Sequence, residues 1–504
     1  MKPPAEMGLP HKFVGWRPGQ ERAVEDFLSC ESRHLVQVIP TGVGKSLIYM
    51  AGAMQKCEPT IILTSTKGLQ DQLVSDFSTM GLVEMKGRSN YRCVRGDGPT
   101  CEDGLCHYGV ECQFKGGGCA YFDALRTAKQ SRYVVTNYAM WLTAGEFLRE
   151  GRQVLVMDEA HAAPDHLNNF LAVEIDLGFI GVATGEDVVP PRDWGGWAKR
   201  FSQTVEALLQ LGLASPDLNL TRLRQLVKVK RTLDALIRIS ASPLVVDKVG
   251  EKYVVNPVCL IRYAEPHLFM GVPFVQMTSA TVTSHTARML GINGYALEEY
   301  PSPFPVSHRP IIWVPTTRVD HRMNHGDELV WLARIDQIIG ARKSRKGIIH
   351  SVSYDRACRI VRASKYGKFA VVHGPSDAAV RVAAFKRREA PAFLVSPSMT
   401  TGWDFPYDQC RWQIIAKVPF PDNRSAIQQA RQSRDPDLPY YTAWQTLIQS
   451  AGRGVRAEDD WCETIIIDDN FGWLLSSYGH LVPRWFTTAV RKNPVAPAPY
   501  EEIG

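Results

Sequence analysis

Residues 39–46 have the types and spacing of a phosphate-binding loop. The segment Ile-Pro-Thr-Gly-Val-Gly-Lys-Ser follows an apolar stretch and precedes a helical pattern. Glycines let backbone N–H groups turn toward a phosphate, and the start of a helix adds a favourable dipole. We expect Lys45 to reach the β- and γ-phosphates and Ser46 to bind Mg²⁺ through its hydroxyl. The other residues expected to contact the nucleotide in this loop are Thr41, Gly42 and Gly44. The alternative is a Gly-Lys-Ser turn without function.

An acidic pair follows a second apolar run, residues 153–157, which ends in Asp158-Glu-Ala-His161. A carboxylate at the tip of a buried strand beside a phosphate loop can hold Mg²⁺, so we assign this role to Asp158. Glu159 is placed to orient the attacking water as a general base. Such a pair is often only the start of a loop. Its position downstream of the Gly-Lys-Ser motif favours a nucleotide hydrolase, and we also expect His161 to belong to the nucleotide site.

The segment Gln449-Ser-Ala-Gly-Arg-Gly-Val-Arg456 carries two arginines three residues apart. On a helix, Arg453 and Arg456 would share one face. An arginine delivered from a second domain can stabilise the negative charge that develops on the γ-phosphate during hydrolysis. We therefore expect Arg453 and Arg456 to be arginine fingers and Gln449 to sense the γ-phosphate. A solvated pair of surface arginines is the alternative, and the position after a second α/β pattern argues against it.

An amide side chain, Gln20, lies upstream of the first apolar run in Arg17-Pro-Gly-Gln20. Its paired donor and acceptor could bind the edge of an adenine. An exposed glutamine without function is the simpler interpretation. The adenine hypothesis rests on the position of Gln20 ahead of the phosphate loop.

Five of the eleven cysteines fall between residues 93 and 119, in the pattern C-x7-C-x4-C-x5-C-x6-C. In an intracellular chain such a cluster indicates a metal or iron–sulfur site sooner than disulfides. A cubane iron–sulfur cluster takes four thiolates, and zinc bound by four cysteines is the rival. Unpaired thiols without a metal are the third possibility.

The elements that must position these residues are predicted by short apolar runs bounded by turn or polar residues. The runs fall into two regions: 34–39, 60–63, 133–135 and 153–157 in the first, and 347–349, 369–372, 392–395, 413–418 and 464–467 in the second. Strands alternating with helices imply parallel sheets with both faces covered. Two α/β domains are the economical interpretation.

Composition excludes several classes of protein. The 504 residues are 45% hydrophobic and 22% charged, as in a globular protein. We find no apolar run of eighteen residues and no apolar core of a secretory signal near the N-terminus, so we expect a cytoplasmic protein without membrane contact. The net charge of +6 permits a nucleic-acid partner but does not require one.

Taken in order, the motifs resemble those of superfamily 2 helicases, and among these the XPD/DinG family of iron–sulfur DNA helicases. The resemblance spans most of the chain. The motifs that carry it are R-P-G-Q (17–20), P-T-G-V-G-K-S (40–46), L-T-S-T-K-G-L-Q-D-Q-L (63–73), K-G-R-S-N-Y-R-C (86–93), V-V-T-N-Y (134–138), D-E-A-H (158–161), T-S-A-T (278–281), G-W-D-F-P (402–406) and Q-S-A-G-R-G-V-R (449–456).

The resemblance implies two RecA-like motor domains with parallel sheets, the first of which carries an iron–sulfur insertion and a short, helical, arch-like insertion. The expected bounds are 1–87, 121–164 and 251–295 for motor domain 1, 88–120 for the iron–sulfur insertion, 165–250 for the arch-like insertion, 296–492 for motor domain 2 and 493–504 for a flexible tail. The region 165–250 is expected to be mostly helical.

The resemblance also favours a [4Fe–4S] cluster over zinc. It implies that Cys93 is the first ligand and Cys119 the last. We expect Cys112 to be a third ligand, and spacing leads us to choose Cys106 over Cys101 as the fourth. The expected role of the cluster is structural.

Other family positions imply contacts between the nucleotide site and the strand. Asp404 matches the residue that links ATP to DNA in the second motor domain, although Thr401 stands where the family often has Glu. Ser279 and Thr281 are expected to hydrogen-bond the D-E-A-H segment. The residues that resemble strand-contacting elements are Thr66, Lys67, Gln70, Asn137 and Tyr138.

The implied function is that of an ATP-dependent DNA helicase moving 5′→3′ on single-stranded DNA, with ATP, Mg²⁺ and a [4Fe–4S] cluster. The expected partners are single-stranded and forked duplex DNA, bound by a monomer. The protein would be associated with the nucleoid in a bacterium or lie in the host cytoplasm if it comes from a phage. The alternatives are an ATP-driven single-strand translocase or remodeller, and a nucleic-acid-binding accessory protein that uses its ATPase as a switch. RNA is also a possible substrate, because D-E-A-H does not select the sugar.

Overall fold

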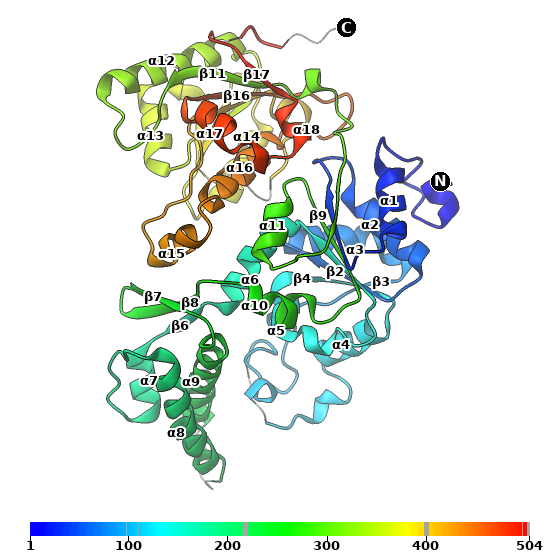
Figure 1. Ribbon diagram of the computed structural model, residues 1–504, viewed down its shortest axis with the longest axis vertical. Helices are drawn as coiled ribbons and strands as arrows, with labels where there is room; N and C mark the ends of the chain where they lie inside the picture. Colours follow the sequence, from blue (N-terminus) through cyan, green and yellow to red (C-terminus); the bar gives the residue numbers. More distant parts are fainter. Residues whose placement is uncertain (97, 109, 215–219, 398–402, 496, 501–504) are drawn as a thin grey trace.

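The computed structural model describes residues 1–96, 98–108, 110–214, 220–397, 403–495 and 497–500. Figure 1 shows two α/β lobes, one above the other, with two smaller lobes beside the lower one. Within the described residues, no helix combines the length and apolar character needed to cross a membrane.

The first sheet has seven parallel strands in the order β10-β1-β9-β5-β2-β4-β3. The bounds are β1 His34–Val38, β2 Thr60–Thr64, β3 Leu82–Glu84, β4 Tyr133–Asn137, β5 Val154–Asp158, β9 Phe274–Ser279 and β10 Ala296–Glu299. Successive residues of β2 alternate between two core clusters, since Ile61 and Leu63 belong to one and Ile62 to the other. Both faces are therefore buried, as a parallel sheet requires.

Helices cover the two faces of this first sheet. One face carries α1 (Gln20–Ser29), α2 (Lys45–Lys56) and α3 (Lys67–Phe77), and the other carries α4 (Ala120–Gln130), α5 (Tyr138–Ala144), α6 (Ala163–Leu171) and α11 (Ser284–Met289). Thr66 and Asn137 accept hydrogen bonds from backbone N–H groups at the starts of α3 and α5, which fixes where these helices leave the strand tips.

The second sheet also has seven parallel strands, in the order β13-β14-β12-β15-β16-β11-β17. The bounds are β11 Ile311–Thr317, β12 Gly347–His350, β13 Ala370–Val372, β14 Phe393–Ser396, β15 Trp412–Ile415, β16 Glu463–Asp468 and β17 Val490–Lys492. Its helices are α12 His325–Arg342, α13 Tyr354–Ala363, α14 Ala378–Arg387, α15 Ala426–Arg434, α16 Leu438–Ala451, α17 Asn470–Tyr478 and α18 Arg484–Thr487. The expectation of two parallel-sheet α/β domains is confirmed.

The arch-like insertion combines helices with a small antiparallel sheet. Its helices are α7 Leu177–Thr184, α8 Trp194–Ala214 and α9 Leu220–Ile239, and its sheet has the order β6-β8-β7, with β6 Val173–Ile175, β7 Leu244–Val249 and β8 Lys252–Pro257. The short helix α10, Ile261–Tyr263, follows. The description "mostly helical" therefore omits a sheet, in which β6 pairs with β8 from far along the sequence and β7 and β8 form a hairpin.

Two expected domain boundaries need correction. The boundary at residue 250 falls inside the β7–β8 hairpin, and hydrogen bonding extends the insertion to Pro257. The boundary at residue 296 would detach β10, which pairs with β1 in the first sheet, so motor domain 1 reaches at least Glu299.

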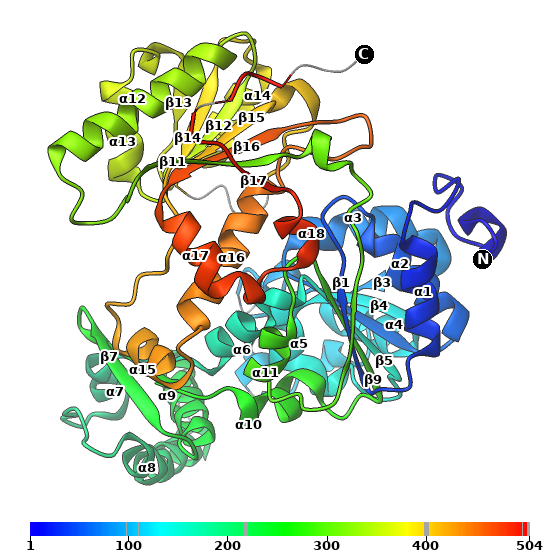
Figure 2. The same ribbon diagram turned by 45° about the horizontal axis from the view of Figure 1, so that its top comes forward.

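The arch-like insertion touches its neighbours on two sides. Helix α9 approaches the cysteine-rich insertion, where Arg231 hydrogen-bonds His107. On the other side β7 packs against α15 of motor domain 2, as Figure 2 shows. Asp247 of β7 accepts hydrogen bonds from the backbone N–H groups of Ala426 and Ile427, at 3.1 and 3.4 Å. A carboxylate at a helix N-terminus is stabilising, so this contact ties the insertion to the second motor domain.

Candidate functional site

The predicted phosphate loop lies between β1 and α2, and it needs glycine at two positions. Gly42 has φ +79° and Gly44 has φ +92°, in the left-handed region that disfavours other residues. A Cβ added to Gly42 would lie 2.5 Å from the ring of Phe304, and one added to Gly44 would lie 2.8 Å from the amide nitrogen of Gln20. The loop ends at Lys45, the first residue of α2, so the N-terminus of a helix points into the site.

Gln20 and Arg17 hold this loop in place. Gln20 is buried, its Nε2 donates to the Val43 carbonyl at 2.6 Å, and its Oε1 accepts from the Arg17 backbone N–H at 2.8 Å. The Arg17 guanidinium donates to the Gly42 carbonyl at 2.6 Å. In this structure the amide of Gln20 is thus bonded to the protein backbone, and adenine recognition by Gln20 stays a prediction.

The acidic pair lies where β5 ends, beside the phosphate loop. Glu159 has φ +50°, a strained conformation for a non-glycine residue. Its carboxylate lies 3.0 Å from the Lys45 ammonium. Asp158 accepts hydrogen bonds from the Glu159 backbone N–H at 2.9 Å and from the Tyr49 hydroxyl at 3.4 Å, and the Tyr138 hydroxyl donates to its carbonyl at 3.0 Å. No local sequence motif indicates the contact of Tyr49, whereas Tyr138 belongs to the V-V-T-N-Y motif, which does not indicate this contact with Asp158.

The two carboxylates differ in acidity because their neighbours differ. Burial and the nearby charge of Glu159 raise the pKa of Asp158 to about 6. Burial opposes ionisation of Glu159 as well, but Lys45 and His161 hold the pKa of Glu159 well below its usual range. Burial would lower the pKa of Lys45, yet the two carboxylates raise it above its ordinary value. Lys45 and Glu159 therefore form an ion pair.

His161 connects this site to the second motor domain. Its Nδ1 lies 2.6 Å from the Ser279 hydroxyl, which in turn donates to Glu159 at 3.2 Å. Its Nε2 is hydrogen-bonded to the Gln449 side chain at 2.5 Å. The expected contact of Ser279 with the D-E-A-H segment is present, whereas the hydroxyl of Thr281 lies 3.4 Å from Ser279 and contacts the segment only through it.

Helix α16 faces motor domain 1 along one stripe, formed by Tyr441, Gln445 and Gln449 at intervals of four residues. The buried Tyr441 hydroxyl bonds Thr286 and donates to the Thr281 carbonyl at 3.2 Å. The Gln445 side chain donates to the His161 carbonyl at 3.5 Å. This stripe leads directly to the predicted arginine fingers that follow the helix.

Arg453 and Arg456 are paired within their own domain. Asp404 forms an ion pair with Arg456 and lies 3.7 Å from Arg453. Arg453 also donates to the Trp403 carbonyl at 3.2 Å. Thr401, the other residue expected in this coupling motif, lies outside the described residues.

The end of α16 lies close to the phosphate loop. A Cβ added to Gly452 would lie 3.1 Å from the Thr41 hydroxyl, and the cavity beside Thr41, Phe304 and Gly452 has a volume of only about 30 Å³. The two motor domains therefore meet beside the phosphate loop, where the Lys45, Glu159, His161 and Gln449 side chains form a continuous series of contacts.

The five residues expected to contact a strand divide into two groups. Thr66 and Lys67 are exposed, and Asn137 is half-buried at the tip of β4. Gln70 is buried and donates to the Met85 carbonyl at 3.1 Å. Tyr138 is also buried and stacks on His166. For Gln70 and Tyr138 the expectation is therefore corrected: both face the core side of their helices and support the surface indirectly.

The cysteine-rich insertion gathers its sulfurs in one place. The Sγ atoms of Cys101 and Cys119 lie 3.8 Å apart. A Cβ added to Gly104 would lie 3.2 Å from the sulfur of Cys93 and 3.7 Å from that of Cys106. These four residues and Cys112 are free thiols. The donor set fits a group held by four thiolates. Cys101 lies among the expected ligands, so its exclusion stays a prediction.

Comparisons with known proteins bear on both motor domains. A family profile described as type III restriction enzyme, res subunit, matches residues 13–179, and one described as helicase C-terminal domain matches residues 350–489. A solved structure named XPD helicase has a TM-score of 0.61 at 14% identity and covers 94% of this chain and 98% of its own. Xpd4 from S. tokodaii has a TM-score of 0.60 at 13% identity, with 94% and 99% coverage. At these identities the likeness establishes the fold alone. A search of curated protein sequences finds no match.

Proposed function

We propose, from the premise that this chain is a superfamily 2 helicase with an XPD/DinG-like fold, that it is an ATP-dependent DNA helicase that moves 5′→3′ on single-stranded DNA. The observation that carries the ATPase part is the continuous contact from Lys45 through Glu159 and His161 to Gln449. It joins the phosphate loop of one domain to α16 of the other, the helix that ends at Ala451, just before Arg453 and Arg456. A site split in this way couples hydrolysis to domain movement.

Lys45 neutralises Glu159 in this structure. Bound phosphates attract the ammonium, and this frees the Glu159 carboxylate to accept a proton from water as a general base. His161 and Ser279 keep that carboxylate oriented. Ser46 and Asp158 would hold Mg²⁺, which neutralises phosphate charge when bound.

Motor domain 2 contributes its guanidinium groups at the γ-phosphate. Arg453 and Arg456 must leave Asp404 to stabilise the charge that develops there. The carboxylate of Asp404 is then unpaired, so nucleotide binding changes the electrostatics of the loop that contains Asp404. This change supports a coupling role for Asp404.

DNA as the substrate and the 5′→3′ direction are supported by the ordered motifs and by the cysteine-rich insertion. The proposed cluster ligands are Cys93, Cys106, Cys112 and Cys119, and a [4Fe–4S] group bound there would cross-link the insertion. The Lys67 ammonium bonds Asn90 at 3.0 Å. It thereby joins an exposed strand-contact candidate on α3 to the start of this insertion.

The test begins with Lys45→Ala, which we expect to abolish ATP hydrolysis while leaving single-stranded DNA binding measurable. Undiminished turnover would refute the phosphate-loop assignment. Unwinding of forked duplexes with a 5′ or a 3′ tail, with protein purified without oxygen, tests the direction. Strand-stimulated ATPase without unwinding would indicate a translocase, and ATP-dependent DNA binding with negligible turnover would indicate a switch.

A further inference from the structure

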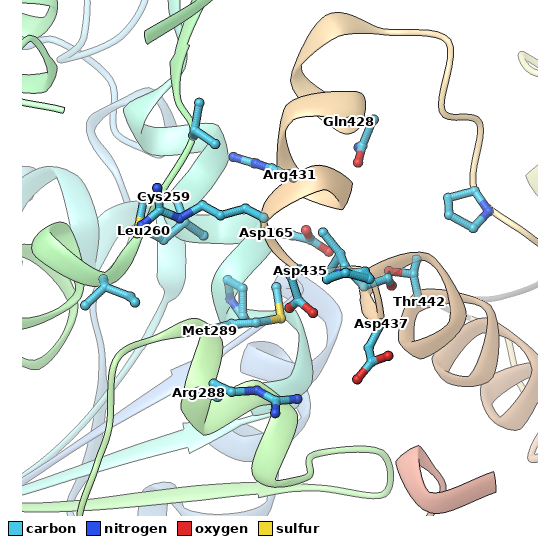
Figure 3. Close-up of a pocket in the computed structure, with 17 residues that line it drawn as sticks. Asp165, Cys259, Leu260, Arg288, Met289, Gln428, Arg431, Asp435, Asp437 and Thr442 are labelled. Carbon is cyan, nitrogen blue, oxygen red and sulfur yellow. The ribbon is translucent and has the colours of Figure 1, made fainter. Parts of the chain in front are cut away.

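A cavity of about 550 Å³ lies between motor domain 1 and motor domain 2, beside the segment after Pro257 by which the arch-like insertion rejoins motor domain 1. Figure 3 shows Gln428, Asp435 and Asp437, from α15 and the start of α16, opposite Met289 of α11 and Leu260. This volume is within the range of small-molecule sites in proteins.

The charged groups of the cavity are mixed. It contains Arg288, Arg431 and Arg434, and against them Asp165, Asp435 and Asp437. An anion without other features would meet three carboxylates, and a cation would meet three guanidinium groups. A wholly apolar ligand would leave these groups desolvated without partners, which is costly.

Some of these charged and polar side chains already bond to other protein groups, and others do not. Arg431 hydrogen-bonds Asn168, and Arg288 donates to His285, whose other ring nitrogen lies 3.0 Å from Asp435. An arginine donating to the Nδ1 of His285 leaves the proton on Nε2, facing Asp435. This arrangement disfavours a metal ion between them. In the described part of the chain, the side chains of four other lining residues make no hydrogen bond or ion pair: Asp165, Gln428, Arg434 and Asp437.

The available groups and the apolar wall match one nucleotide unit of a single strand. A guanidinium suits the phosphate, and an amide with a carboxylate suits the donors and acceptors on a base edge. The base faces would contact the apolar residues Leu260, Met289 and Pro436. Methionine is well suited to this because its sulfur packs favourably against aromatic rings.

The cavity also continues the surface on which strand contacts are expected. Asn137 lies at the tip of β4, and the α5 helix that follows packs against α6. Helix α6 then supplies Pro164 and Asp165 to the cavity. A strand crossing from motor domain 1 to motor domain 2 along α5 and α6 reaches the cavity next.

We infer that this cavity binds one nucleotide unit of the translocating strand, with Arg434 on the phosphate and Gln428 and Asp437 on the base edge. The inference rests on the proposed function, because it takes a single strand as the substrate. Since Asp437 and Leu438 begin α16, an occupied cavity contacts the same helix that ends at the arginine fingers.

Cys259 provides a direct probe, because its thiol lines the cavity, while Cys57 and Cys358 are exposed elsewhere. Peptide-resolved alkylation of the wild-type protein should show that a short single-stranded oligonucleotide slows modification of Cys259 and leaves Cys57 and Cys358 unchanged. Deoxymononucleotides at the same nucleotide concentration should not protect Cys259. Equal protection by mononucleotides would overturn the assignment to a strand.

Variants provide the second measurement. Arg434→Gln should weaken oligonucleotide binding roughly tenfold and reduce the salt dependence of binding by about one counterion. In the wild-type protein, replacing one nucleotide of the oligonucleotide by an abasic nucleotide should lower the binding affinity. Gln428→Ala should make this loss of affinity smaller. The matched control is Arg381→Gln on α14, which removes the same charge from an exposed arginine paired only with Asp377. It should bind the strand like wild type.

If the strand binds and stimulates ATPase, but Cys259 is alkylated at an unchanged rate and Arg434→Gln equals Arg381→Gln, the cavity assignment is wrong and the helicase proposal stands. If the wild-type protein neither binds a single strand nor responds to it, the helicase proposal fails and this inference fails with it.

Discussion

The two motor domains each end a central parallel strand with a buried aspartate, and the two aspartates are used differently. Asp468, at the end of β16, accepts hydrogen bonds from the backbone N–H groups of Val418, Val319 and Asn470 at 2.8, 3.1 and 3.0 Å, and from the Asn470 side chain. Asp158, at the end of β5, accepts from one backbone N–H and at long range from Tyr49.

This difference shows that a carboxylate at a strand tip is not enough to make a metal site. Burial raises the pKa of both groups, but the acceptor capacity of Asp468 is filled by the backbone. That of Asp158 is largely unused, so it can bind a ligand. Asp468 joins three loops of motor domain 2, and we assign it to stability rather than to catalysis.

The largest expected effect separates these two roles. Asp158→Asn should lower ATPase activity roughly 10³-fold, by loss of an electrostatic contribution to the reaction, with no loss of thermal stability. Asp468→Asn should lower the free energy of unfolding by about 3 kcal/mol, because buried N–H donors lose their acceptor. Denaturant unfolding and steady-state ATPase assays on both variants measure this. An Asp468→Asn protein as stable as wild type would remove the distinction.

The second prediction concerns the guanidinium of Arg456, which motor domain 2 is proposed to contribute to the nucleotide site. Arg456→Gln should lower kcat about 10²-fold and change ATP affinity much less, since the guanidinium acts on charge that develops during hydrolysis. Single-turnover hydrolysis with fluorescent-nucleotide binding checks this. Arg424→Gln, on an exposed arginine of the same domain paired with Asp422, is the control. An equal loss of affinity and turnover would contradict a transition-state role.

The third prediction concerns pH. The pKa of Asp158 in the folded chain is about 6, above its unfolded value. Its neutral form is therefore favoured on folding, and stability is lost as pH rises from about 4 through 6. In EDTA without nucleotide, Asp158→Asn should gain up to about 2–3 kcal/mol over wild type by pH 8 and almost nothing near pH 4. Asp468→Asn should stay less stable than wild type over this range because of its lost hydrogen bonds, although the deficit should narrow as pH rises, since burial also raises the pKa of Asp468. A pH-independent difference for Asp158→Asn would contradict the assigned cause.

The smallest effect is expected for Tyr441→Phe, which deletes the hydroxyl that bonds Thr286 and Thr281 across the domain interface. The contact between the two motor domains should lose about 1 kcal/mol of stabilisation. This loss should appear as a several-fold decrease in strand-stimulated ATPase, with basal turnover and melting temperature nearly unchanged. Thr446→Val on the same helix, where the hydroxyl bonds the helix backbone, should leave strand stimulation intact. An equal loss in both variants would argue against a coupling role.

Local patterns were sufficient to predict the phosphate loop, the D-E-A-H segment and most central strands, because contiguous residues specify them. Tyr49, Tyr441 and Asp468 could not be found in this way. Their partners come from distant segments, and a tyrosine in a buried helix has the pattern of an ordinary core residue. The β7–β8 hairpin was missed because most of its residues are only partly buried and charged residues interrupt its apolar runs.

The same limit explains the errors at the strand surface. Gln70 and Tyr138 occur in motifs with exposed neighbours, but Gln70 lies on the buried face of α3 and Tyr138 on the buried face of α5. Only the fold shows which face of each helix is covered. Burial does not argue against the predicted strand contacts of Lys67 and Asn137, since Lys67 is exposed and Asn137 is partly accessible.

The ion pairs between Asp404 and the two arginines have a consequence for how often the enzyme hydrolyses ATP to no purpose. A guanidinium already neutralised by a carboxylate interacts weakly with a second anion until the first contact is broken. ATP bound to motor domain 1 alone therefore competes with Asp404 for Arg456. If the two arginines act at the γ-phosphate as proposed, turnover depends on an event that releases them from Asp404 as well as on ATP concentration, and a chain that is not bound to a strand hydrolyses little ATP.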